Sequence, residues 1–233
     1  MKIHSLISAM ALITASSSVL AQDLDITLTN LTQGLHFTPV VSAAHTADSP
    51  IFSIATTATA ELQAMAEGGD ISGLVSMLAN ADANVMENPA GGLLAPAMST
   101  SFMLTNDEGN DYLSFAAMIL PSNDGFVGLN SWMIPETPGT YTLFLNAYDA
   151  GTEANNELIV ADSGAPGIAG IPAAPGGNAG SNGTGVTDTE DNMMIHIHRG
   201  NLGDDDLAAG TSDLDNRIHR WLNPVAKVTV VVQ

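Results

Sequence analysis

Short segments that alternate apolar and polar residues, separated by turn residues, constrain this chain most. Alternation with a period of two is typical of strands with one buried face. One segment, residues 112–120, is apolar almost throughout, which is typical of a strand buried on both faces. The turns are rich in glycine, proline, asparagine and aspartate. The pattern predicts an all-β protein, an antiparallel β-sandwich of about eight strands, and its clearest segments are 25–31, 98–105, 112–120, 126–133, 140–148 and 224–232.

Two short helices are expected to interrupt the strands. Residues 58–66 place Leu62, Met65 and Ala66 on one helical face, and the glycines at 68 and 69 end that helix. Asp70 is a suitable cap for a second helix over 71–78.

Differences in composition along the sequence indicate how the chain is organised. Residues 1–21 combine Lys2, an apolar stretch and a V-L-A exit, which is typical of a cleaved secretory signal peptide and too short to span a membrane. The remaining residues, 22–233, are the right length for one β-sandwich domain. Within it, residues 161–190 contain mostly Gly, Ala, Pro, Ser, Asn and Asp, which predicts a long, flexible, low-complexity loop. We therefore expect a secreted or periplasmic protein.

The charge balance excludes some partners. The chain has 5 Lys and Arg against 25 Asp and Glu, and it has no cysteine. Between Gln22 and His198 there is no Lys or Arg at all. Such an acidic surface is typical of adaptation to salty water, and it disfavours nucleic acid and anionic lipid as partners. It also means that metal cations are the available partners for carboxylates over most of the chain.

Three acids are expected to converge at one end of the sandwich. Strand 112–120 leads into a turn that contains Asp124, and strand 140–148 leads into a turn that contains Asp149 and Glu153. If 126–133 runs back between them, the two strands point the same way and their ends meet. The acids are then either solvated separately or joined by a cation, for which flexible oxygen ligands favour Ca²⁺ over Zn²⁺, copper or Mg²⁺.

Two motifs resemble the spondin N-terminal domain, the module of F-spondin and of bacterial extracellular proteins. They are P-S-N-D-G-F-V-G at 121–128 and Y-D-A-G-T-E at 148–153. The similarity is to the bacterial members and extends from about residue 24 to 232, outside the low-complexity loop. Supporting segments are I-T-L-T-N-L at 26–31, A-E-G-G-D at 66–70 and R-W-L-N-P-V-A-K-V-T-V at 220–230.

The resemblance implies a C2-like β-sandwich that binds one calcium ion through Asp124, Asp149 and Glu153. Two positions depart from the animal pattern: Glu153 stands where Asp is usual, and Gly125 where Trp is usual. The cysteines of the animal domains are also missing. The implied function is that of a calcium-binding adhesion module, without catalysis, for an extracellular matrix or cell-surface ligand whose identity stays open.

Two alternatives remain from the residues themselves. The first is a secreted or periplasmic hydrolase that uses the same carboxylates as general acid and base. The second is a transition-metal protein, because His196 and His198 are two residues apart and would share one face of a strand. A third ligand would come from one of the other histidines, His36, His45 or His219. The simpler hypothesis for the pair is a polar strand face against bulk water.

Overall fold

The computed structural model describes residues 21–176, 180–206 and 208–233. Of the predicted signal peptide, residues 1–20 lie outside this part. The strands of the described part form one antiparallel sheet in the order β4-β3-β6-β7-β8-β10-β1-β5, with β2 added beside β6 and β9 beside β8. The strands are β1 (Gln22–Asn30), β2 (His36–Phe37), β3 (Val41–His45), β4 (Asn84–Glu87), β5 (Ser99–Asn106), β6 (Tyr112–Leu120), β7 (Gly125–Met133), β8 (Gly139–Asp149), β9 (His196–Ile197) and β10 (Ala226–Val232).

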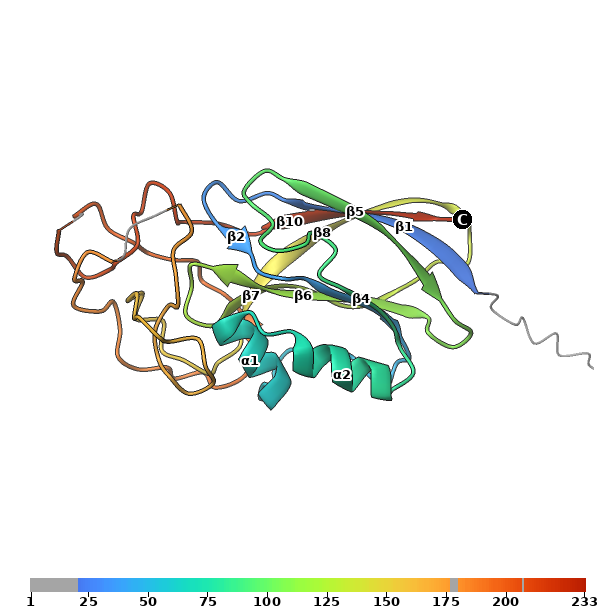
Figure 1. Ribbon diagram of the computed structural model, residues 1–233, viewed down its shortest axis with the longest axis horizontal. Coiled ribbons are helices and arrows are strands. Elements are labelled where there is room, and N and C mark those ends of the chain that lie inside the picture. The colour runs from blue at the N-terminus through green and yellow to red at the C-terminus, as the bar shows by residue number, and fades with distance from the viewer. Residues whose placement is uncertain (1–20, 177–179, 207) are drawn as a thin grey trace, which may run out of the picture.

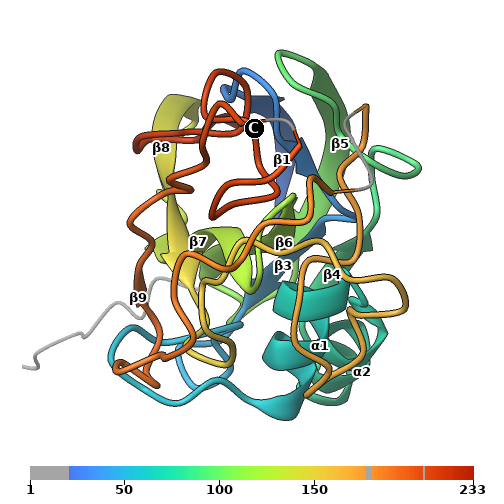
Figure 2. The ribbon, with the colours of Figure 1, turned by 90° about the vertical axis from the view of Figure 1, so that its left-hand side faces the viewer.

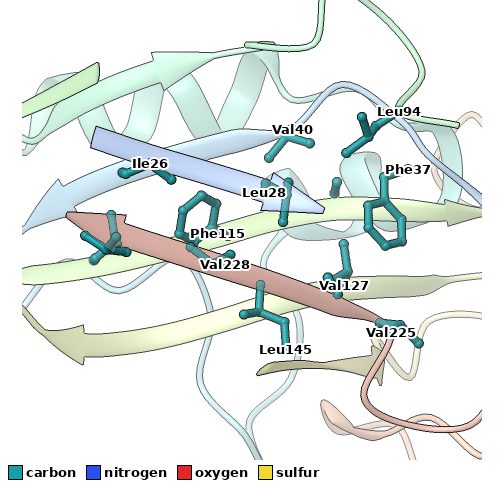
Figure 3. Close-up of a cluster of buried hydrophobic side chains, with 14 of the residues drawn as sticks. Ile26, Leu28, Phe37, Val40, Leu94, Phe115, Val127, Leu145, Val225 and Val228 are labelled. Atoms are coloured by element: carbon teal, nitrogen blue, oxygen red, sulfur yellow. The ribbon is translucent and has the colours of Figure 1, made fainter. Parts of the chain in front are cut away.

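The sheet folds over on itself into a nearly closed sandwich. One layer contains β4, β3, β6 and β7, and the other contains β10, β1 and β5, while β8 passes from one to the other (Figure 1). The two edge strands, β4 and β5, also contact each other. Between the layers lies a core of buried side chains, among them Ile26, Phe115, Val127 and Val228 (Figure 3). The predicted antiparallel β-sandwich is confirmed.

The central strand β6 is buried on both faces, as its continuous apolar sequence predicts. Phe115 and Ala117 point into the core between the layers. Their neighbours Ala116 and Met118 point the other way, into a second core beneath the helices. Strand β6 thus joins the two hydrophobic clusters of the molecule.

Two short helices, α1 (Ala60–Gly68) and α2 (Ser72–Asn80), cover the outer face of the β6 layer (Figure 1). Thr59 caps α1 by accepting a hydrogen bond from the Leu62 amide at 3.2 Å. Gly69 ends α1 in the left-handed conformation, at φ 73°. Asp70 accepts a hydrogen bond from the Ser72 amide at the start of α2. Both predicted helices are confirmed, each displaced by one or two residues.

Most of the chain between β8 and β10 forms loops at one end of the sandwich (Figures 1 and 2). Residues 161–190 contribute to the packing there, because Ile171 is fully buried and pairs with Ile159. Strands β2, β3 and β4 are additional to the six clearest predicted segments. Strand β9 covers His196, for which the spacing of the two histidines predicted a strand. Within the described residues, no helix combines the length and the apolar character needed to cross a membrane.

Candidate functional site

The strand order places the predicted acids together at the loop end. Strands β6, β7 and β8 are successive antiparallel neighbours, so β6 and β8 run in the same direction. Asp149, the last residue of β8, pairs with Gly125, which directly follows Asp124. The Ala150 amide also donates a hydrogen bond to the backbone carbonyl of Asp124 at 3.2 Å. The proximity of Asp124 and Asp149, expected from topology, is therefore present.

Asp124 is completely buried, and only one of its carboxylate oxygens has hydrogen-bond donors. Oδ2 accepts bonds from the Thr152 amide at 2.8 Å, the Thr152 hydroxyl at 3.1 Å and the Glu153 amide at 3.2 Å. Oδ1 is buried with no hydrogen-bond partner. The aspartate thus fixes the loop that carries Glu153 while one of its oxygens stays free to bind something else.

Glu153 repeats this arrangement. Its Oε2 accepts bonds from the Asn123 side-chain amide at 3.1 Å and from the Gly170 amide at 3.0 Å. Its Oε1 is buried without a hydrogen-bond partner. The bond to Gly170 draws the 161–190 segment onto the site, which the composition of that segment gave no reason to expect.

Asp149 is bonded at both oxygens and lies next to two histidines. Oδ1 accepts from the Gly151 amide at 2.9 Å, and Oδ2 accepts from the Asn155 side-chain amide at 2.7 Å. The Nε2 atoms of His196 and His198 lie 4.0 and 3.8 Å from the same Oδ2. The site therefore joins carboxylates and imidazoles that the sequence assigns to separate motifs.

Burial makes this cluster electrostatically unusual. It raises the pKa of Asp124 to about 8, and the nearby charge of Asp149 adds to that shift. Burial likewise raises the pKa of Glu153 to about 7, with a smaller contribution from Glu67. The pKa of Asp149 is also raised, chiefly by burial. A bound cation would oppose these shifts by stabilising the charged forms.

Other buried acids in the molecule show how a carboxylate is accommodated without a cation. Glu157 accepts from the Leu202 amide at one oxygen, and from the Gly203 amide and the Ser212 hydroxyl at the other. Glu67 is likewise bonded at both oxygens. Among the buried acids, Asp124 and Glu153 differ because each keeps one bare oxygen. A bare buried acceptor costs free energy unless a ligand satisfies it.

The acids fit a calcium ion only if other oxygens join them. Within the described residues, no three His, Cys, Asp or Glu side chains form a group that could by itself hold a metal ion. Calcium also accepts amide and backbone carbonyl oxygens and water as ligands. The bare oxygens of Asp124 and Glu153 are compatible with such a mixed site. Ligation of a metal by Asp124, Asp149 and Glu153 stays a prediction.

The two histidines do not form a solvent-facing pair. His198 is 4% exposed and its ring packs on Trp221 with centroids 4.9 Å apart. Its Nδ1 accepts the Gly200 amide, so the proton of the neutral ring is on Nε2, which faces Asp149. Burial lowers the pKa of His198 to about 3, so this ring is neutral. The hypothesis of a polar face against bulk water is wrong for His198, which instead forms a wall of the carboxylate cluster.

Sequence reasoning missed the residues that hold the acids in place. Asn123 lies inside the P-S-N-D turn and Asn155 just after Glu153, so their closeness to the acids in sequence was a usable signal. Gly170 had no such signal, because it lies in the low-complexity segment and contributes only a backbone amide.

Gly151 offers a test of how tightly the site is packed. Its φ is 71°, and a Cβ there would approach the backbone of residues 192–194 to within 2.7–2.8 Å. We expect Gly151→Ala to destabilise the protein by about 2 kcal/mol or more, from steric overlap added to left-handed strain. Urea unfolding measures this change. Gly91→Ala is the matched control, because Gly91 has φ 70° and open space around it. Equal losses in both variants would contradict the packing argument.

Comparison with known protein families finds a match over the part of the chain that carries the three acids. The model of the family described as Spondin_N matches residues 28–162, which is more than half of the chain and includes all three predicted acids. This family consists of extracellular modules of the adhesion type, which are not enzymes. A search of curated proteins found no match.

Proposed function

Since the chain belongs to the spondin N-terminal domain family, we propose that it is an exported, calcium-binding adhesion module without catalytic activity. In this proposal Asp124, Asp149 and Glu153 supply carboxylate ligands at the loop end of the sandwich. The ion would fix the loops, and the loops would present a surface to a matrix or cell-surface ligand. The predicted signal peptide supports export.

One observation carries the metal proposal. Asp124 and Glu153 each have a buried carboxylate oxygen without a hydrogen-bond donor, although the other oxygen of the same group is well bonded. Within the described residues neither acid forms an ion pair, and the nearby Arg199 donates to the Asn155 carbonyl instead. Since an unpaired buried charge is strongly disfavoured, these acids are either protonated or bound to a cation. A divalent ion in contact with a bare oxygen would satisfy it and balance its charge.

Binding there would affect three loops together. Asp124 belongs to the loop after β6, Asp149 is the last residue of β8, and the loop that follows β8 carries Glu153. Through its bond to Gly170, Glu153 is linked to the 161–190 segment. A calcium ion would neutralise the mutual repulsion of the acids and stabilise all three segments in one arrangement. This gives the metal a structural role in shaping the binding surface.

The hydrolase alternative is less well supported by the geometry. Raised carboxyl pKa values are common at sites of general acid catalysis. However, Asp124 and Asp149 are 0% and 1% exposed, so a substrate has no direct access to their carboxylates. Catalytic acids need to come within hydrogen-bond reach of the reacting group. The burial of these acids instead suits an ion enclosed by loops.

Isothermal titration calorimetry of the secreted protein with CaCl₂ at pH 8 tests the proposal. We expect one calcium site, with a dissociation constant of about 10⁻⁴ M as in other extracellular modules. Asp149→Asn should weaken binding by at least about tenfold, because it removes the charge of a ligand. The matched control is Asp188→Asn, which removes one charge from an exposed loop residue with no role in the site. Absence of calcium heat in the unaltered protein would refute the metal proposal.

A further inference from the structure

One edge of strand β8 has no neighbouring strand over most of its length. Along residues 139–145, β8 pairs with β10 on one side. On the other side, the ladder between β8 and β7 covers only residues 146–149 of β8. Strand β7 continues over 129–133 paired with β6 alone, so β7 and β8 separate there. Within the described residues, the second edge of 139–145 therefore pairs with no strand, and β8 lies at one side of the sandwich (Figure 2).

Side chains fill the gap between β7 and β8 on the core side. Trp132 of β7 packs against Tyr141 of β8, with the ring centroids 5.8 Å apart. Both rings are half-buried against the core between the layers. On the outer face of β8, Thr142 is exposed and Phe144 is 62% exposed. Another strand could therefore extend the sheet at this edge without entering the core.

The sequence of this edge lacks the features that keep native edge strands from pairing with copies of themselves. Those features are charged side chains, especially lysine, proline within the strand, and β-bulges. Residues 140–145 read T-Y-T-L-F-L, with no charge and no proline, and their register with β10 is regular. The threonines and aromatic residues also have high strand propensity. Such an edge is a template for pairing with a further strand.

The charge distribution favours a second copy of this chain as the partner. Glu136 is the one charged residue between Asp124 and Asp149, in a chain that has 25 acids. The neighbouring strand β10 contains no acid, and its charged residue is Lys227. Two copies with a net charge of −20 each repel one another where their acids meet. At the β8 edge they can meet without bringing acids together, whereas a cationic partner would be drawn to the acids elsewhere on the surface.

We propose that two copies of this protein form a symmetric dimer by antiparallel pairing of their β8 edges around Thr142. The two-fold axis would place the two Thr142 side chains opposite each other, and each Thr140 opposite Phe144 of the other copy. The backbone groups of this edge, which have no partner strand in a single copy, would then bond across the dimer. The layer of β8, β10, β1 and β5 would continue into the same layer of the second copy. The dimer does not depend on the calcium proposal, because residues 139–145 precede the part of β8 that carries Asp149.

Sedimentation velocity of the secreted protein over a range of concentrations tests the proposal. EDTA is present throughout, so that a metal cannot bridge the copies. We expect a monomer at low concentration and a dimer at high concentration. The dimer should be at least about tenfold tighter in about 1 M NaCl than in about 0.1 M NaCl, because the Debye length falls from about 10 Å to about 3 Å and the repulsion between the copies is screened. A single monomeric species at all concentrations up to about 100 μM would overturn the proposal.

A matched pair of variants locates the interface. Thr142→Lys is expected to abolish the dimer, although it lowers the net negative charge, because it places two like charges opposite each other at the centre of the pairing. Thr229→Lys is the control, since Thr229 pairs with Thr142 in the sheet and lies on β10, which has a strand on both sides. The control should form the dimer as the unaltered protein does. The proposal is wrong if the two variants behave alike.

Amide hydrogen exchange gives a measurement that does not depend on a substitution. Amides of residues 140–144 that have no partner strand in the monomer should exchange more slowly as the protein concentration rises and the dimer forms. Amides of the helices α1 and α2, on a different face of the molecule, should not change. Added protection that appears only outside β8 would show that the copies associate through another surface, and would overturn the proposal.

Discussion

Without calcium, the protein is expected to lose about 5 °C in melting temperature between about pH 6.5 and about pH 8.5. The pKa of the Asp124 carboxyl is raised from 3.8 to about 8 in the folded protein, and that of Glu153 from 4.5 to about 7. The folded state therefore retains protons that the unfolded chain has already released. Stability is lost as the pH rises towards these folded-state values, because the unfolded chain has released protons that the folded protein still holds, and the loss levels off above about pH 8. The loss amounts to about 2 kcal/mol.

In this pH range the buried histidines contribute little to the change in stability. Burial lowers the pKa of His45, His198 and His219, so these groups reduce stability only below their unfolded value of 6.5. Above that value the acids dominate. Differential scanning calorimetry in EDTA measures the slope, and Asp124→Asn should flatten it. A melting temperature that rises with pH over this range would contradict the burial of a protonated carboxyl.

Calcium is expected to reverse this loss, and to do so only where the acids can release their protons. At pH 8, about 10 mM CaCl₂ is roughly 100 times the expected dissociation constant, which corresponds to about 2.7 kcal/mol of stabilisation and about 5–10 °C in melting temperature. At pH 6 the gain should nearly vanish, because Asp124 and Glu153 must first lose protons that they bind tightly. Thermal unfolding with and without the ion measures both values.

Two controls distinguish a specific ion from a salt effect. Mg²⁺ at the same concentration should stabilise the protein less, because it requires a stricter octahedral arrangement of ligands. Asp149→Asn should lose at least about half of the gain at pH 8, because tenfold weaker binding leaves about 1.4 kcal/mol, and it should retain the fold. If the unaltered protein gains equally at pH 6 and pH 8, or if the variant gains as much as the unaltered protein, calcium acts elsewhere on this acidic surface.

The fold was predictable where the chain repeats a simple pattern. Strands β6 and β8 have long apolar or alternating sequences, and their turns contain glycine and proline, so their order and direction could be inferred. That order brings Asp124 beside Asp149, as expected. Strand β4 could not be inferred, because N-V-M-E is short and its first three residues are equally half-buried, which leaves no alternation.

The loop contacts around the acids were not predictable, for a physical reason. Glu153 is held by Asn123 and by the Gly170 amide, and the second of these uses only backbone. A backbone donor can belong to any residue, so the residue type at a position does not indicate that its amide will bind the acid. His198 was singled out as a metal ligand candidate, yet its burial against Trp221 depends on how the C-terminal loops pack. Neither contact follows from spacing.

The burial of β6 on both of its faces affects how the protein unfolds. Its side chains belong alternately to the core between the layers and to the core beneath the helices. Detaching α1 and α2 would expose one face of β6 to water, and opening the sandwich would expose the other. Neither the helices nor the second layer of the sandwich can unfold without exposing a face of β6. The helices and the sandwich should therefore unfold in one concerted transition.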